Sequence, residues 1–185
     1  QALRAMADGL RTSREAILAA NAEDVRETTA AGLPAALLDR LTLTPKRVDE
    51  MVQSVAAVAA LPDPVGEVIR AWRRPNGLQI RKVRVPLGVI GIIYESRPNV
   101  TSECASLCVK SGNAVLLRGG AEAFRSNQAI GGVLRGALRA AGLPEAAVSL
   151  IPTPDRAAVD VMLTLDQAID VIIPRGGELL IRKIA

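Results

Sequence analysis

Hydrophobic positions repeat at helical spacing through the first third of the chain. One apolar face runs from Leu3 to Leu18 and predicts an amphipathic helix over that stretch. Asn21 is a favourable residue for a helix N-cap and Asp24 stands three positions later, so the pair predicts the start of a second helix. Gly32 predicts the end of that second helix.

Two further helices are indicated by prolines at their first positions. Pro34 predicts a short helix ending at Leu41, because a proline in the first turn loses no intrahelical hydrogen bond. Thr44-Pro45 predicts a longer helix with one apolar stripe. The members of that stripe are Val48, Met51, Val52, Val55 and Val58. The prolines of Leu61–Pro64 end this helical layer, which we assign to residues 1–70.

The period of the pattern changes from Trp72 onward. Pro75-Asn76-Gly77 is a turn sequence, and apolar and polar residues alternate from Leu78 to Val85. This alternation predicts a partly exposed β-hairpin, which we assign to residues 71–86.

Short apolar runs then alternate with helical patterns. The runs are Gly88–Tyr94, Ala114–Leu117, Val148–Ile151 and Ala168–Ile173. The helical patterns lie at 100–110, 121–141 and 155–165, with a further helix predicted after Gly176. Uninterrupted apolar strands separated by helices are typical of a parallel sheet covered on both faces. The predicted fold class is therefore α/β, a doubly wound parallel sheet over 87–185 that follows the helical layer and the hairpin.

Composition narrows the classes of function. The longest apolar run has about ten residues, too few to span a bilayer, so we expect no membrane partner. The net charge is +4, but 23 basic residues are interspersed with 19 acidic ones and aromatic residues are scarce. We therefore expect no nucleic-acid partner. The sequence contains no histidine, which excludes Cys/His metal sites and Ser–His catalysis within these residues, and we expect no metal.

The two cysteines, Cys104 and Cys108, lie four positions apart in a helical stretch. Small apolar neighbours surround them, so we interpret both as buried core residues rather than as nucleophiles. Two cysteines do not make a disulfide framework, which favours a reducing, cytoplasmic compartment.

Candidate chemistry follows the predicted strands, because ligands of open parallel sheets bind at the carboxyl ends of the strands. The residues there are Glu95–Asn99, Arg118-Gly119-Gly120, Pro152–Pro154 and Pro174-Arg175-Gly176-Gly177. Two of these tips carry arginine beside paired glycines. Glycine lets backbone N–H groups approach an anion, and arginine offers a forked donor for phosphate. The pair suits a dinucleotide; the alternative is that the glycines only permit tight turns. The G-x-G-x-x-G fingerprint is absent, so a dinucleotide would bind by another mode.

Two segments carry a resemblance to a known family. "VPLGVIGIIYESRPNVTSECASLCVKSGNAVLLRGGAEAFRSN" and "LDQAIDVIIPRGG" resemble the gamma-glutamyl phosphate reductases, also called glutamate-5-semialdehyde dehydrogenases, of the aldehyde dehydrogenase superfamily. The resemblance implies an aldehyde dehydrogenase-like cofactor domain and the amino-terminal part of such an enzyme. It implies a cytoplasmic oxidoreductase of proline biosynthesis that uses NADP (NADPH) to reduce L-glutamate 5-phosphate to L-glutamate 5-semialdehyde and phosphate.

The resemblance also implies a cysteine thioester in that reaction. Neither Cys104 nor Cys108 matches the family's nucleophile, which we expect beyond residue 185, so no catalytic residue is assigned in this chain and it is expected to be inactive alone. The alternative is a non-catalytic nucleotide-binding or assembly module on the same scaffold.

Roles for individual residues follow only from this resemblance. Arg118, Gly119 and Gly120 are expected at the adenosine end, Pro152 near the adenine, and Pro174, Arg175, Gly176 and Gly177 over the pyrophosphate. Ala121 stands where superfamily members often carry a glutamate for the ribose, which favours NADP over NAD, although Glu122 is adjacent. Tyr94, Glu95, Arg97 and Asn99 are candidates for the substrate or reacting end, and the oxyanion donor is left open. The hairpin resembles oligomerisation strands, so a homo-oligomer is expected.

Overall fold

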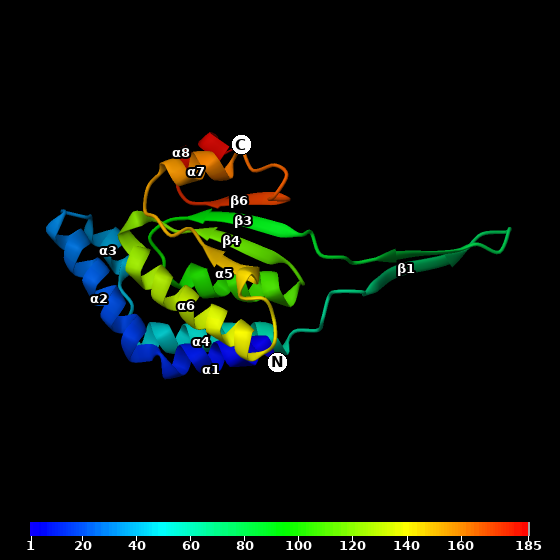
Figure 1. The fold of residues 1–185 in the computed structure, drawn as a ribbon, viewed down its shortest axis with the longest axis horizontal. Helices are drawn as coiled ribbons and strands as arrows, with labels where there is room; N and C mark the ends of the chain where they lie inside the picture. The colour runs from blue at the N-terminus through cyan, green and yellow to red at the C-terminus, as the bar shows by residue number, and fades with distance from the viewer. Residues whose placement is uncertain (185) are drawn as a thin grey trace.

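The computed structural model describes residues 1–184 and combines helices, a protruding hairpin and a parallel sheet (Figure 1). The helices are α1 (Ala2–Thr12), α2 (Arg14–Ala30), α3 (Ala35–Leu41), α4 (Pro45–Ala60), α5 (Asn99–Lys110), α6 (Phe124–Ala140), α7 (Ala157–Met162) and α8 (Glu178–Ile184). Short 3-10 turns are η1 (Ala121–Ala123) and η2 (Glu145–Ala147). The strands are β1 (Val68–Arg73), β2 (Gln79–Val83), β3 (Val89–Tyr94), β4 (Ala114–Arg118), β5 (Val148–Leu150) and β6 (Val171–Arg175).

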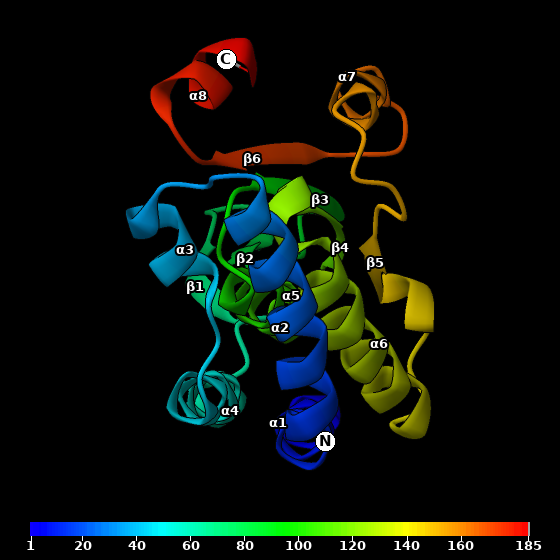
Figure 2. The same ribbon diagram turned by 90° about the vertical axis from the view of Figure 1, so that its left-hand side faces the viewer.

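The main sheet has helices on both faces, as the apolar runs predict. Within residues 1–184 its strand order is β5-β4-β3-β6, and each neighbouring pair is parallel. α5 and α6 lie on one face, and α7 and α8 lie on the other (Figures 1 and 2). β3 is buried from Ile90 to Tyr94 because both of its faces are covered. The α/β doubly wound fold class is confirmed.

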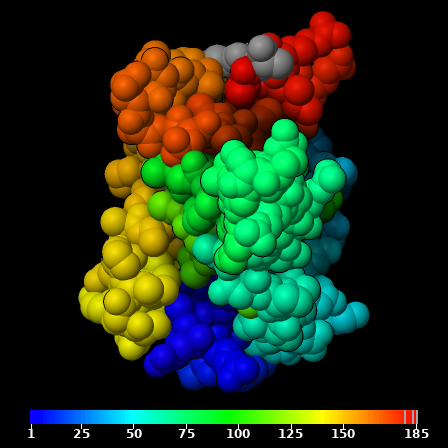
Figure 3. All heavy atoms as spheres, turned by 90° about the vertical axis from the view of Figure 1, so that its right-hand side faces the viewer, coloured from blue at the N-terminus to red at the C-terminus, as the bar shows by residue number. Residues whose placement is uncertain are grey.

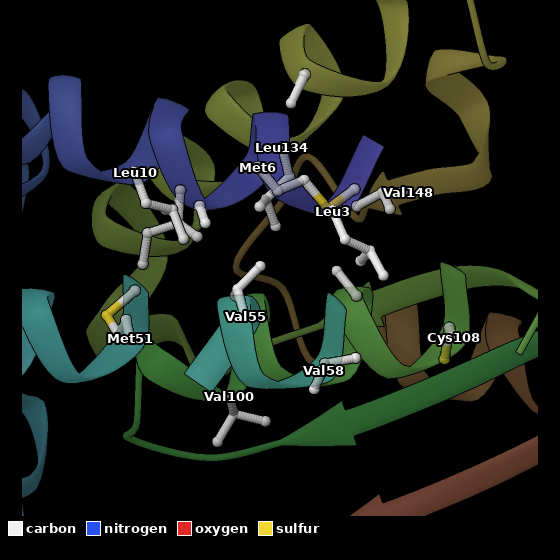
Figure 4. Close-up of a cluster of buried hydrophobic side chains, with 14 of the residues drawn as sticks. Leu3, Met6, Leu10, Met51, Val55, Val58, Val100, Cys108, Leu134 and Val148 are labelled. Carbon is white, nitrogen blue, oxygen red and sulfur yellow. The ribbon is translucent and has the colours of Figure 1, made fainter. Parts of the chain in front are cut away.

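One continuous core joins the helical layer to the sheet. Figure 4 shows Leu3, Met6 and Leu10 of α1 against Met51 and Val55 of α4. The same cluster continues into α5, α6 and β5 through Val100, Cys108, Leu134 and Val148. A smaller cluster on the opposite face contains Ile93, Val159, Met162 and Ile169. α4 begins as predicted: Pro45 occupies its first turn and the Thr44 hydroxyl accepts a hydrogen bond from the Arg47 N–H at 3.2 Å.

The predicted cap at Asn21 is wrong. α2 begins at Arg14 and runs without interruption past Asn21 and Asp24, whose side chains are both buried. The Asn21 amide donates to the Leu41 carbonyl at 2.9 Å and accepts from the Leu43 N–H at 2.7 Å. The Asp24 carboxylate accepts from the Ser126 N–H at 2.8 Å, in the first turn of α6. These polar side chains therefore satisfy backbone groups of other elements rather than of their own helix.

The hairpin strand β1 begins at Val68, earlier than the boundary at 71 expected from the sequence. β1 and β2 pair antiparallel, and β1 is exposed along its whole length. The hairpin extends away from the end of the sheet opposite α3 (Figure 1), and in Figure 3 it stands in front of the remaining atoms as the green segment. None of the helices formed by residues 1–184 is long and apolar enough to cross a lipid bilayer.

β6 lies farther along the chain than the predicted run, because Pro174 and Arg175 still pair with β3 opposite Ile93 and Tyr94. Proline lacks the N–H that a strand donates on one side, and β6 is the outer strand of the described sheet. Pro174 and Arg175 are therefore strand residues, and the turn toward α8 begins only at Gly176.

Candidate functional site

The strand ends that carry the candidate residues meet at one edge of the sheet. Ile93 pairs with Arg118, and Tyr94 pairs with Arg175, so the ends of β4 and β6 lie on either side of the end of β3. α2 and α3 lie beside this end of the strands (Figures 1 and 2). The topology therefore brings together the two Arg-Gly-Gly tips and the turn after Tyr94.

Three cavities lined by described residues follow this edge. The first, about 550 Å³, is lined by Arg118, Gly120, Ser96 and Glu122, with Leu33 and Leu37 before and within α3. The second, about 340 Å³, is lined by Glu95, Arg97, Arg175, Gly176, Gly177 and Arg40. The third, about 300 Å³, is lined by Arg97, Asn99, Glu103, Arg40, Arg47 and Glu50. Neighbouring cavities share Glu95 and Ser96, or Arg97 and Arg40, so they form one continuous surface across the strand ends.

Arg118 ends β4 and is a buried residue, at 8% exposure. One terminal nitrogen donates to the carbonyl of Pro154 at 3.0 Å and more weakly to that of Asp155 at 3.3 Å. Its Nε atom is buried without a partner. Arg118 thus ties β4 to the loop after β5 while keeping a positive charge and one unpaired donor beside the first cavity.

Neighbouring side chains fill the space beside Gly119, the first glycine after Arg118. A Cβ at Gly119 would overlap the Asn127 amide and lie 3.1 Å from the Tyr94 ring. Asn127 accepts from the Thr101 hydroxyl at 2.9 Å, and that hydroxyl also bonds the Tyr94 hydroxyl at 2.6 Å. Burial raises the pKa of the Tyr94 phenol above its ordinary value, so this hydroxyl stays neutral, and Tyr94 lines the first and second cavities.

The glycines after Arg175 face a carboxylate instead. The Glu95 carboxylate accepts from the Gly177 N–H at 3.0 Å. A Cβ at Gly176 would lie 2.7 Å from the carboxyl carbon of Glu95. Arg175 itself is exposed and pairs with Glu103 at 3.4 Å. A negatively charged group therefore already sits against this turn.

The candidates at the reacting end lie on the turn between β3 and α5. Asn99 begins α5 and its amide donates to Glu103 at 2.6 Å. Arg97 is exposed, lines the second and third cavities, and has no ion-pair partner among the described residues. Three sequence candidates do not line the three cavities: Gly119 packs against Asn127 and Tyr94, Pro152 is exposed in the loop after β5, and Pro174 lies in the sheet.

Neither cysteine lines the three cavities. Cys108 is buried in α5, and desolvation raises the pKa of its thiol to about 11. Desolvation also raises the pKa of the Cys104 thiol. Both thiols are therefore protonated near neutral pH, whereas a nucleophilic cysteine needs a lowered pKa. Cys108 is a buried core residue as predicted, whereas Cys104 is only partly buried and packs against the margin of the same core.

Known proteins match the whole chain. A gamma-glutamyl phosphate reductase of Rhodopseudomonas palustris is 56% identical over 185 residues, which are all of this chain and 43% of that protein. The crystal structure of gamma-glutamyl phosphate reductase from Thermotoga maritima superposes with a TM-score of 0.97 at 47% identity, over all of this chain and 44% of that one. The chain is similar to the gamma-glutamyl phosphate reductases along its entire length. The resemblance stated from the sequence is confirmed.

The fold also extends beyond the gamma-glutamyl phosphate reductases. A probable aldehyde dehydrogenase from Listeria monocytogenes superposes with a TM-score of 0.71 at 17% identity, over 99% of this chain and 37% of that one. No protein-family model matches the chain. The chain spans less than half the length of the gamma-glutamyl phosphate reductases named above.

Several residues of the site were missed from the sequence. Leu33, Leu37 and Arg40 form one wall of the cavities, yet their local pattern only indicates a short helix. Glu122 was noted as a neighbour of Ala121, but its bonds to Ser96 were not foreseen. No periodicity or motif predicts these positions, because they depend on which elements the fold brings together.

Proposed function

We propose that the chain forms the cofactor-binding part of an NADPH-dependent reductase that converts L-glutamate 5-phosphate to L-glutamate 5-semialdehyde and phosphate in proline biosynthesis. The observation that carries the proposal is the whole-chain similarity to gamma-glutamyl phosphate reductases, joined to cavities that run across the ends of β4, β3 and β6. Parallel sheets of this class bind their ligands at that edge.

The chemistry of the edge fits a dinucleotide. The Gly177 N–H already donates a hydrogen bond to the Glu95 carboxylate, so this turn can bind a negatively charged oxygen. At the other end, Arg118 keeps a buried charge and an unpaired Nε donor. In the proposed complex the turn at Gly176-Gly177 binds the pyrophosphate, which displaces Glu95, and Arg118 lies at the adenosine end.

Preference for NADP over NAD is proposed to depend on Arg118. A 2′-phosphate is doubly charged near neutral pH and pairs well with a guanidinium. Ala121 removes a carboxylate from the position expected for a ribose-binding glutamate. The Glu122 carboxylate points toward Ser96 and accepts two hydrogen bonds from it. These bonds weaken the electrostatic repulsion between this carboxylate and a 2′-phosphate.

The third cavity is proposed to take the amino-acid part of the substrate. L-Glutamate 5-phosphate carries an α-carboxylate and an α-ammonium in addition to its acyl phosphate. The cavity offers Arg40 and Arg97, neither of which has an ion-pair partner among residues 1–184, together with the acids Glu50 and Glu103. This mixed lining matches a zwitterion, and Arg97 also borders the second cavity, toward the phosphate end.

When bound, NADPH supplies the hydride for the reduction. The residues of this chain hold the cofactor and substrate at adjoining cavities, and the protonated thiols of Cys104 and Cys108 do not supply the nucleophile. We further propose a cytoplasmic enzyme that assembles as a homo-oligomer through the exposed hairpin, because an open strand edge pairs readily with another chain.

The test uses the protein expressed from its complete reading frame. With glutamate 5-semialdehyde, phosphate and NADP, we expect NADPH to appear in the absorbance spectrum, and its formation to require phosphate. Reactions without phosphate, or with NAD in place of NADP, are the controls. Equal rates with NAD, independent of phosphate, would contradict the proposal. Dinucleotide binding without any turnover would favour the alternative of a non-catalytic nucleotide-binding or assembly module.

A further inference from the structure

The turn between β3 and α5 has an unusual backbone conformation. Ser96 has a φ of +35°, and among residues 1–184 it is the only non-glycine residue with a positive φ. L-amino acids rarely adopt such values, and the strain persists only where surrounding structure holds it. Ser96 is also buried, at 8% exposure. Something in the fold must therefore hold this turn.

The group that holds the turn is the carboxylate of Glu122. Its Oε1 atom accepts from the Ser96 N–H at 2.7 Å and from the Ser96 hydroxyl at 2.6 Å. Glu122 lies in η1 after β4, so these bonds join the ends of two neighbouring strands. Hydrogen bonds to an ionised acceptor are stronger than neutral ones, which suits a clamp on a strained residue.

Gly120 makes this contact sterically accessible. A Cβ at position 120 would lie 2.5 Å from the Glu122 carboxyl carbon, which is closer than unbonded atoms approach. The side chain of Glu122 folds back over Gly120 to reach Ser96. An alanine at position 120 would therefore push the Glu122 carboxylate away from Ser96.

The turn sets the directions of the residues on either side of Ser96. The Arg97 N–H donates to the Glu95 carbonyl at 2.6 Å, which closes a tight turn around Ser96. From there the Glu95 carboxylate reaches Gly177 and Arg97 lines the second and third cavities. A relaxed φ at Ser96 would turn both side chains away from these positions.

We propose that Glu122 is a positioning residue of the site. Its carboxylate holds Ser96 in the strained conformation and thereby fixes Arg97 at the reacting end and, before a cofactor binds, sets Glu95 against Gly177. The carboxylate is committed to the turn and is not a reader of the cofactor ribose. The kinetic part of this inference rests on the proposed function, whereas its structural part does not.

The experiment compares Glu122→Ala with Glu122→Gln in the protein expressed from its complete reading frame. Glu122→Ala removes both bonds, so we expect faster amide hydrogen exchange in peptides covering residues 94–99. We also expect kcat/KM for glutamate 5-semialdehyde to fall by about tenfold to a hundredfold, the scale of a misplaced reacting group. The loss should be equal with NADP and NAD. Glu122→Gln keeps the Oε1 acceptor and should retain slow exchange and most of the activity.

A second substitution tests the strain directly. Glycine adopts positive φ without penalty, so Ser96→Gly in the Glu122→Ala background should recover part of the lost kcat/KM. Ser96→Ala removes only the hydroxyl bond and should give a smaller loss than Glu122→Ala. Glu145→Ala is the matched control, because Glu145 is a partly exposed acid that pairs with Arg139 away from the site.

Three outcomes would overturn the inference. Unchanged amide hydrogen exchange and unchanged kinetics in Glu122→Ala would show that Glu122 does not hold the turn. A shift of preference between NADP and NAD in Glu122→Gln would assign the carboxylate to the cofactor. If Glu122→Ala does not fold, Ser96→Ala decides: unchanged amide exchange and unchanged kinetics in that variant would likewise exclude the clamp. If the unsubstituted protein lacks the proposed activity, the exchange measurements still decide the role of Glu122.

Discussion

The tripeptide Arg-Gly-Gly occurs at the ends of both β4 and β6, and the two copies have different environments. In the first copy, Arg118 is buried and bonds backbone carbonyls, while Gly119 packs against Asn127 and Tyr94. In the second, Arg175 is exposed in a long ion pair, and Gly177 presents its N–H to the carboxylate of Glu95. Both copies flank β3 at the same edge of the sheet.

The difference shows that the role of a short motif depends on the position of its strand in the sheet and not on its sequence alone. β4 is an inner strand, so its tip is surrounded by α6, α5 and the loop after β5, and its glycines are required for packing. β6 is the outer strand of the described sheet, so its tip is open to the second cavity. Gly176 leaves room for the side chains of Glu95 and Leu180, and Gly177 presents its N–H to the Glu95 carboxylate. Gly119 and Gly120 instead leave room for Asn127 and Glu122.

The largest expected difference concerns stability. In Gly119→Ala the new Cβ overlaps an asparagine amide that is itself held by Thr101, so the free energy of unfolding should fall by about 1–3 kcal/mol. Gly177→Ala is the matched control: its Cβ would meet only the Glu95 carboxylate at 4.0 Å, and the change should stay within about 0.5 kcal/mol. Denaturant unfolding of both variants measures the two free energies of unfolding. Equal losses in the two variants would show that the two tips do not differ in packing.

The second difference concerns cofactor preference. Arg118→Ala should weaken binding of NADPH more than binding of NADH, by about 1–3 kcal/mol for loss of a buried charged contact. Arg175→Ala removes an exposed ion pair and should affect both cofactors alike, by at most about 1 kcal/mol. Titrations of each variant with both dinucleotides provide the comparison. Equal losses in Arg118→Ala would mean that Arg118 does not contact the 2′-phosphate.

The smallest expected effect concerns the anion-accepting turn. Glu95→Gln removes the negative charge that lies against the Gly177 N–H, so a pyrophosphate should displace the side chain more easily. Dinucleotide affinity should rise about two- to fivefold, the scale of a charge near a helix terminus. Glu145→Gln, at a partly exposed acid elsewhere, is the control. An unchanged affinity in Glu95→Gln would show that the carboxylate and the dinucleotide do not share this turn.

The fold could be predicted well from the sequence, because its main signals are local. The apolar runs of β3 and β4 and the stripe of α4 need only the strand and helix periods, and they appear where expected. The start of α2 was misplaced because Asn21 carries a capping side chain, and only the tertiary structure shows that its amide serves the connection between α3 and α4. Local propensity gives way when a buried partner lies elsewhere in the chain.

The site could be predicted in outline only. The general rule for parallel sheets located the strand ends, and the arginines and glycines there were found by residue type. The partners of those residues were not predictable. Ser96 and Glu122 are separated by 26 positions, and Glu95 and Gly177 by 82, so nothing in either local pattern indicates the contact. The roles proposed for Arg118, Arg97 and Gly176-Gly177 remain predictions until cofactor and substrate binding are measured.

Asp24 has a consequence for how the chain folds as a unit. Its carboxylate closes the first turn of α6 from a position 102 residues earlier, and Asn21 bonds the hydroxyl of the same Ser126 at 3.0 Å. Removing the helical layer would leave these α6 groups without partners and would expose the apolar face that α1 and α4 cover. The first sixty residues are therefore an obligate folding partner of the sheet, and the two parts should unfold in one cooperative transition.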